Sequence, residues 1–307
     1  MKRILLALGA CLLSSAVLAD LRIGVSIAQV NDVFLAAERD YLDQYAKKQQ
    51  GVSLQFEDAQ GDTVRQLNQV QGFVSQGVDA MIINPVDTAA TKGITEAATK
   101  AGIPLVYINR RPDQATLPAG VGYIGSDEVE AGRLQMQYLA DKMGGKGNLA
   151  IILGLLSNNA TYNRTKGVKE VLAKYPDIKV VAEQNADWER QRGMDLMNNW
   201  LTSDKKINAV AANADEMAIG AAMAIKQSGL TPGKDILVGG SDGGPDGLAA
   251  IKSGLLAVTA FQDNKGQAEG AVDMAMKMAK KEKVEQEVTI PYRLITPDNL
   301  KEFTASK

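Results

Sequence analysis

The chain has 307 residues, of which 45% are hydrophobic and 23% are charged, and its formal net charge is −2. This composition is typical of a globular protein with one large or two medium domains, and the charge provides no basic field to attract nucleic acid or an anionic membrane. The chain has no histidine and one cysteine, Cys11. These counts exclude histidine-based acid–base catalysis, Ser-His triads, imidazole metal sites, internal disulfides and cysteine-rich metal centres.

Residues 1–19 have the pattern of a secretory signal peptide. Lys2 and Arg3 give a positive start, Ile4–Leu13 is an apolar run too short to span a bilayer, and Ala19 ends a stretch of small residues. We therefore expect cleavage after Ala19 and export to the periplasm as a soluble chain without cysteine. The alternative is acylation of Cys11, because residues 8–11 resemble a lipobox.

Short apolar runs then alternate with amphipathic stretches such as 62–76. Strands that are buried on both faces read as continuous apolar runs, so the pattern predicts parallel sheets covered by helices. We expect strands at 21–28, 52–58, 79–84, 104–109 and 121–126, and a second series at 148–154, 178–184, 208–213, 235–240 and 256–262. Helical stretches are expected to end on a left-handed glycine cap at Gly51, Gly77, Gly102, Gly229 and Gly254.

Two similar series of strands predict an α/β fold of two doubly wound parallel-sheet lobes rather than one large sheet. The N-terminal lobe is expected to comprise 20–125 and 263–290, and the C-terminal lobe 126–262 and 291–307, joined by a hinge of several crossings. Open α/β sheets bind ligands beyond the carboxyl ends of their strands. Two facing lobes therefore predict a cleft that closes around a small molecule.

Four segments at these strand ends carry a family resemblance, namely 79–85 (DAMIINP), 108–110 (INR), 214–220 (ADEMAIG) and 240–243 (GSDG). Each is weakly specific alone, but all four occur in order behind a signal peptide. From Leu21 to about Leu300 the chain thus resembles the ribose/galactose type of periplasmic solute-binding protein, which supplies ABC importers. The resemblance implies a type I periplasmic binding protein fold, a sugar or cyclitol ligand and a membrane permease as partner.

In the first lobe, the resemblance implies ligand contacts from residues that follow three strands. These are Asp32 and Phe34 after the first strand, Asn84 after the third, and Asn109 and Arg110 after the fourth. Carboxylates, amides and guanidinium groups meet the paired donors and acceptors of a buried polyol, and aromatic rings cover its C–H faces. Structural alternatives are a helix N-cap for Asp32, a core position for Phe34 and a turn for Asn84.

In the second lobe, the resemblance implies contacts from Arg164, Trp188, Asn213, Asp242 and Gln262. Asp242 lies in a glycine-rich turn that permits close backbone approach. The alternatives are a solvated helix residue for Arg164, a core residue for Trp188 and a hinge residue without ligand contact for Gln262.

The chain departs from the family pattern at two positions. Asn109 stands where the family typically has an aspartate, and Ala214 stands where it usually has an asparagine. Alanine cannot bond a hydroxyl, so either the ligand lacks a group there or Asn213 serves it. We expect the following residue, Asp215, to cap a helix rather than to bind the ligand.

Asp32 and Asp242 balance Arg110 and Arg164, which favours a neutral monosaccharide or cyclic polyol. Segments 30–35, 83–88 and 109–112 look like the inositol-binding branch, so we expect myo-inositol, with ribose, galactose and xylose as alternatives. We expect a monomer and no enzyme, cofactor or metal. A chemoreceptor is a compatible further partner.

Two other classes of function share parts of this pattern. A carboxylate pair across the cleft is compatible with a glycosidase, but binding already explains the same residues. A transcriptional regulator with the same two-lobed core would need a DNA-binding headpiece where the signal peptide stands.

Overall fold

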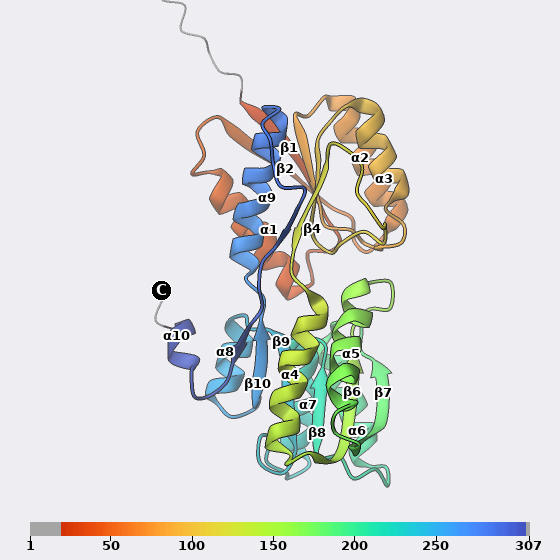
Figure 1. The fold of residues 1–307 in the computed structure, drawn as a ribbon, viewed down its shortest axis with the longest axis vertical. Coiled ribbons are helices and arrows are strands. Elements are labelled where there is room, and N and C mark those ends of the chain that lie inside the picture. Colours follow the sequence, from red (N-terminus) through yellow and green to blue (C-terminus); the bar gives the residue numbers. More distant parts are fainter. Residues whose placement is uncertain (1–19, 305–307) are drawn as a thin grey trace, which may run out of the picture.

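The computed structural model describes residues 20–304. Two α/β lobes are stacked along the long axis of the molecule (Figure 1). The predicted signal peptide and lipobox lie outside the described residues. Within residues 20–304, no helix is long and apolar enough to cross a membrane.

The N-terminal lobe takes its elements from two separate parts of the chain. They are β1 (Leu21–Ile27), α1 (Val33–Ala46), β2 (Val52–Asp58), α2 (Thr63–Gln76), β3 (Ala80–Ile83), α3 (Lys92–Ala101), β4 (Leu105–Asn109), β5 (Val121–Gly125), α9 (Asn264–Ala279) and β11 (Glu287–Thr289).

The C-terminal lobe contains the middle of the chain and its last elements. They are α4 (Glu128–Lys142), β6 (Lys146–Leu153), α5 (Asn159–Leu172), β7 (Asp177–Asn185), α6 (Arg190–Leu201), β8 (Ala209–Ala212), α7 (Asp215–Gln227), β9 (Leu237–Asp242), α8 (Pro245–Lys252), β10 (Val258–Phe261), β12 (Arg293–Ile295) and α10 (Leu300–Thr304).

Each lobe is built on a six-stranded sheet. The strand order is β11-β5-β4-β3-β1-β2 in the first and β12-β10-β9-β8-β6-β7 in the second. The pairs are parallel, except that β12 runs antiparallel to β10. In both sheets the order runs outward in two directions from the first strand, which confirms the predicted doubly wound arrangement.

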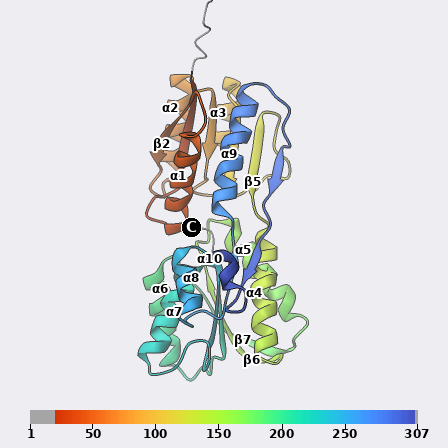
Figure 2. The same ribbon diagram turned by 90° about the vertical axis from the view of Figure 1, so that its left-hand side faces the viewer.

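Helices cover both faces of each sheet, as the turned view shows (Figure 2). On the first sheet, Leu42 of α1 and Val272 of α9 belong to the core on one face, while Phe73 of α2 and Ala98 of α3 belong to the core on the other. Strand residues between them, such as Ile82, are fully buried. Burial on both faces explains why the strands read as continuous apolar runs.

The predicted glycine caps were right for most helices. Gly77 and Gly102 close α2 and α3 in the left-handed conformation, with φ of 62° and 69°. Gly229 and Gly254 also have positive φ and follow the last residues of α7 and α8. The prediction for Gly51 was wrong, because α1 ends well before it and Gly51 lies at the turn into β2.

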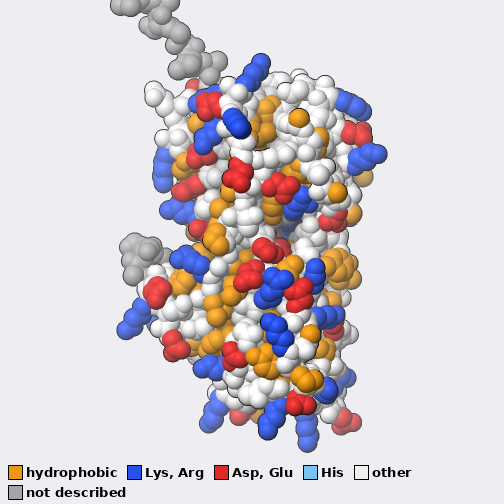
Figure 3. Space-filling view, in the orientation of Figure 1, with side chains coloured by type: hydrophobic (Ala, Val, Ile, Leu, Met, Phe, Trp, Pro, Cys, Tyr) orange, Lys and Arg blue, Asp and Glu red, His pale blue; other side chains and the backbone are white. Residues whose placement is uncertain are grey.

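Three connections join the lobes, from β5 to α4, from β10 to α9 and from β11 to β12. The last joins two three-residue strands that the sequence did not predict, because such short strands show no periodicity. We retain the lobe boundaries given above as a proposal. On the face that Figure 3 shows, acidic and basic side chains are interspersed over both lobes.

Candidate functional site

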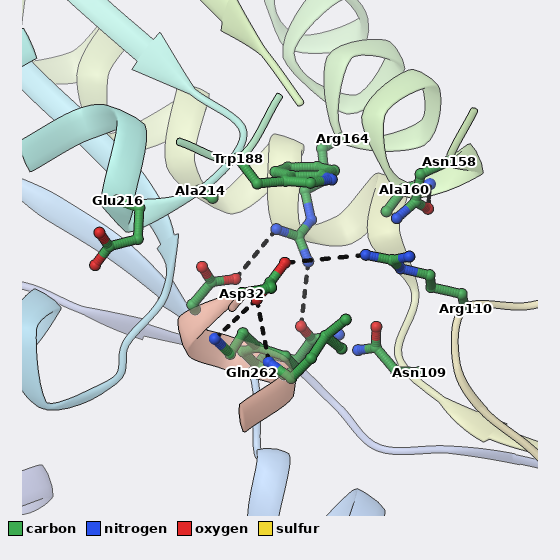
Figure 4. Close-up of a pocket in the computed structure, with 13 residues that line it drawn as sticks. Asp32, Asn109, Arg110, Asn158, Ala160, Arg164, Trp188, Ala214, Glu216 and Gln262 are labelled. Carbon is green, nitrogen blue, oxygen red and sulfur yellow. Dashed lines mark hydrogen bonds and ion pairs between the residues drawn. The ribbon is translucent and has the colours of Figure 1, made fainter. Parts of the chain in front are cut away.

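A cavity of about 50 Å³ lies between the lobes, at the carboxyl ends of strands from both sheets. Its side chains come from the last residues of strands, from the loops that follow and from the first turns of helices (Figure 4). All predicted site residues line it except Asn84 and Asn213. The lining residues are Asp32, Phe34, Leu35, Asn109, Arg110, Asn158, Ala160, Arg164, Trp188, Ala214, Glu216, Asp242 and Gln262.

Asp32 is both a helix cap and a cavity residue. Its Oδ1 accepts hydrogen bonds from the amides of Phe34 and Leu35 at 2.9 and 3.1 Å, which caps α1. Its Oδ2 lies 3.9 Å from a guanidinium nitrogen of Arg110. The cap therefore fixes the carboxylate at the cavity wall, and the structural alternative coexists with the predicted placement.

Arg110 is buried in the N-terminal lobe. It donates a hydrogen bond to the carbonyl of Pro85 at 3.0 Å. Burial lowers the pKa of its guanidinium, while Asp32 and Glu38 oppose that shift. Glu38 itself is fully buried on α1, and its carboxylate has no hydrogen-bond partner among the described residues. Burial raises the pKa of Glu38 to about 8.

Arg164 organises the opposite wall. Its Nη1 donates to the carbonyl of Asn213 at 2.6 Å and to Oδ1 of Asp242 at 3.2 Å, and its Nη2 donates to Oε1 of Gln262 at 3.1 Å. The remaining donors bind Glu128 and Tyr292. Burial raises the pKa of Asp242, and the neighbouring guanidinium opposes the rise.

The Trp188 ring packs against the backbone of Gly154, which follows the last residue of β6. A Cβ atom placed on Gly154 would overlap the indole ring, so only glycine allows the ring to lie there. The guanidinium carbon of Arg164 lies 5.7 Å from the ring centroid. The indole nitrogen is buried and has no hydrogen-bond partner among the described residues.

Backbone strain is concentrated in the cavity. Asn109, Trp188 and Asp242 all have positive φ, at 64°, 69° and 120°. Asparagine tolerates the left-handed region, but tryptophan and aspartate at these angles are costly. Such residues cluster at ligand-binding sites, where the surrounding structure maintains them.

The two predicted residues outside the lining lie buried at strand ends. Asn84 donates from Nδ2 to the carbonyl of Ile108 at 3.3 Å. Asn213 accepts a hydrogen bond from the amide of Gly154 at 3.1 Å, and its side chain also contacts Thr165. Both support the loops that carry lining residues, and direct ligand contact stays a prediction for them.

Sequence reasoning missed Leu35, Asn158, Ala160 and Glu216. Oδ1 of Asn158 accepts a hydrogen bond from the amide of Ala160 at 3.0 Å, which caps α5. Glu216 forms a bidentate ion pair with Arg190, at 2.8 and 2.7 Å. The available signal was their position at helix starts after strands, a position that Asp32 shares but that many residues without a ligand role also occupy.

Asp215 does not cap its helix as predicted. It is the first residue of α7, which has no side-chain cap at Ala214. Its carboxylate instead accepts hydrogen bonds from the amide of Gly243 at 2.8 Å and from the hydroxyl of Thr259 at 2.7 Å. Asp215 therefore fixes the turn that follows Asp242 instead of capping α7.

The charged groups of the cavity are paired within the protein. Asp32 faces Arg110, Asp242 faces Arg164, and Glu216 is neutralised by a residue of α6. A charged ligand would have to break one of these pairs, whereas a neutral polyol can bond to the free lone pairs of the two carboxylates and to the remaining N–H groups of Arg110. Within residues 20–304, no group of three or more acidic, histidine or cysteine side chains is placed to hold a metal ion.

Residues 23–283 match a protein family described as a periplasmic binding protein domain. A protein of Rhizobium meliloti, named as a candidate rhizopine-binding protein, is 43% identical over 306 residues and covers 99% of both chains. The xylitol-binding protein of Mycolicibacterium smegmatis is 36% identical over 280 residues, which cover 91% of this chain and 78% of that protein.

A solved structure has the same fold over almost the whole chain. It is the crystal structure of an ABC transporter solute-binding protein from Bacillus halodurans with bound myo-inositol, with a TM-score of 0.89 and 39% identity. The match covers 94% of this chain and 99% of that one.

Proposed function

The chain belongs to the periplasmic binding protein family, and on this premise we propose its ligand and mode of action. The relatives described above are binding proteins and not enzymes. It is the sugar- or cyclitol-binding component of an ABC importer, and it traps myo-inositol between its lobes. The hinge closes on the ligand in the periplasm, and the closed form delivers it to a membrane permease.

The observation that carries this proposal is the pairing of every charged side chain that lines the cavity. Asp32 with Arg110 and Asp242 with Arg164 present carboxylate and guanidinium edges close together. A cyclitol carries hydroxyls around its whole ring, and each can accept from one group and donate to the next. A phosphorylated or acidic sugar would leave a buried charge without a partner.

Trp188 supplies the surface for the ring. We infer that the C–H face of the ligand packs on this indole, with Phe34 contributing from the other lobe. The cavity of about 50 Å³ is small beside the ~150 Å³ void that holds benzene in an engineered protein core. Ligand entry therefore requires the lobes to separate and the lining side chains to move apart.

The comparisons support two ligands. The relative of known structure was crystallised with myo-inositol at 39% identity, which favours that cyclitol. The Rhizobium meliloti relative, at 43% identity, favours rhizopine as a second candidate. Ribose, galactose, xylose and xylitol complete the set of ligands to be compared.

Thermal unfolding of the mature protein, refolded to remove bound ligand, tests the proposal. A ligand at about 1,000 times its Kd adds ~4 kcal/mol to the free energy of unfolding. In a chain of this size that raises Tm by roughly 10 °C, since ~1 kcal/mol shifts Tm by ~2–4 °C. We expect that shift with myo-inositol and little change with ribose.

The other outcomes distinguish an error in the proposed ligand from an error in the proposed binding function. A comparable shift with rhizopine, ribose, galactose or xylose and none with myo-inositol would keep the binding function and overturn the choice of ligand. No shift with any polyol would contradict the proposed function itself.

A further inference from the structure

One buried residue at each of the three lobe crossings contacts the same guanidinium, that of Arg164. Glu128 is the first residue of α4, after the crossing from β5. Gln262 follows β10, at the start of the crossing to α9. Tyr292 precedes β12, at the end of the crossing from β11. Nε of Arg164 donates to Oε2 of Glu128 at 2.6 Å, and Nη2 donates to Gln262 at 3.1 Å and to the Tyr292 hydroxyl at 2.9 Å.

These partners also bond to one another. The Tyr292 hydroxyl donates to Oε2 of Glu128 at 2.8 Å, and Nε2 of Gln262 donates to Oε1 of Glu128 at 3.1 Å. The four residues are only 2% to 7% exposed. A buried polar network of this kind is rigid when every member has its partners, and it becomes costly when one is lost.

The network uses every donor of Arg164. A guanidinium has five N–H groups, and here they bind Glu128, Asn213, Asp242, Gln262 and Tyr292. Arg164 can therefore donate to a ligand only by giving up a protein contact. The longest of its five hydrogen bonds is the 3.2 Å bond to Asp242, the residue that faces the cavity.

We propose that Glu128 and Tyr292, which do not line the cavity, are positioning residues that lock Arg164, and through it Asp242, to the C-terminal-lobe ends of all three crossings. Bending between the lobes is then confined to the short segments beyond this anchor. The carboxylate offered to the ligand keeps a fixed position relative to the hinge. This inference rests on the proposed function, because it assigns these residues to the same binding site.

The test is Tyr292→Phe, which removes one hydroxyl and keeps the ring. We expect binding of myo-inositol, measured by titration calorimetry, to weaken about 10-fold, because the lost hydrogen bond loosens the guanidinium that holds Asp242. Glu128→Gln should weaken binding at least as much. Tyr175→Phe is the matched control, because its hydroxyl bonds to Gln137 and Asp141 away from the hinge.

A double-mutant cycle distinguishes positioning from a general loss of stability. If Tyr292 acts through Arg164 on Asp242, Tyr292→Phe should cost little further affinity in an Asp242→Asn background. Additive losses, or unchanged affinity of Tyr292→Phe, would overturn the inference while wild-type binding of myo-inositol leaves the proposed function intact. Absence of myo-inositol binding by the wild-type protein would instead refute the proposed function.

Discussion

At the scale of single residues, the site combines structural and ligand-facing roles in the same side chains. Asp32 caps α1 with one carboxylate oxygen and faces Arg110 with the other. Asn109 and Trp188 place their side chains from a left-handed backbone. Position is thus fixed before any ligand arrives, which reduces the ordering cost of binding.

Gly154→Ala tests whether the position of the Trp188 ring depends on the absence of a side chain at residue 154. The added methyl would overlap the indole, so the ring must move, and we expect affinity for myo-inositol to fall about 10-fold because an aromatic contact is worth roughly 0.5–1.5 kcal/mol. In a Trp188→Ala background the same change should have little effect.

Gly72→Ala on α2 is the control, since a Cβ there meets only the end of the Gln76 side chain. Equal affinity of Gly154→Ala and wild type would show that Trp188 does not contact the ligand. Both affinities can be measured by titration calorimetry.

The resemblance to sugar-binding proteins pointed to Asp32, Arg110 and Asp242, and each of them lies at or after the end of a buried strand, where strand ends converge in this fold. Sequence reasoning could not identify Glu216, because a carboxylate in the first turn of a helix is common at any helix start. It also misassigned Asp215, whose partners Gly243 and Thr259 are distant in sequence.

At the scale of elements, α1 carries an unusual buried carboxyl group. Glu38 has a pKa of about 8 in the folded protein, against 4.5 ordinarily. Between these values the folded protein binds more protons than the unfolded chain, so the free energy of unfolding falls as pH rises from about 4.5 to about 8. Arg110 partly offsets the effect, and Asp32 adds to it.

We expect Glu38→Gln to reduce this fall by an amount on the order of a few kcal/mol, because the amide stays neutral throughout. Urea unfolding of both proteins at pH 5 and pH 8 measures it. Asp40→Asn, on the exposed side of the same helix, should leave the pH dependence as in wild type. A parallel decline in wild type and Glu38→Gln would refute the buried, neutral state of this group.

The strands and helices were largely predictable, because each buried strand is a continuous apolar run and each long helix is amphipathic. The exceptions are β11 and β12, which flank the third crossing and have three residues each. They are held by pairing with β5 and β10 rather than by their own sequence pattern.

At the scale of the whole molecule, the lobes meet at a contact away from the hinge. Nδ2 of Asn159, at the start of α5, donates to the carbonyl of Arg111 at 2.6 Å and to Oδ1 of Asp113 at 3.0 Å. The amide of Thr88 donates to the carbonyl of Ser157 at 3.3 Å. These hydrogen bonds join the two lobes, and in the proposed mode of action they form only when the lobes close.

Asn159→Ala should therefore speed release of myo-inositol about 10-fold while leaving its association rate unchanged, because two hydrogen bonds are lost only from the closed form. Stopped-flow fluorescence measures both rates. Ser157→Ala is the control, since Ser157 contributes its backbone carbonyl. A slower association with unchanged release would contradict this role.

The most direct test of the central claim is calorimetric titration of myo-inositol, and separately of ribose, into the refolded mature protein. The account predicts one site per chain, a Kd of about 1 μM or tighter, corresponding to roughly −8 kcal/mol, and binding of ribose at least ~10-fold weaker. Saturable binding of ribose in preference to myo-inositol, or no binding of either, would contradict it.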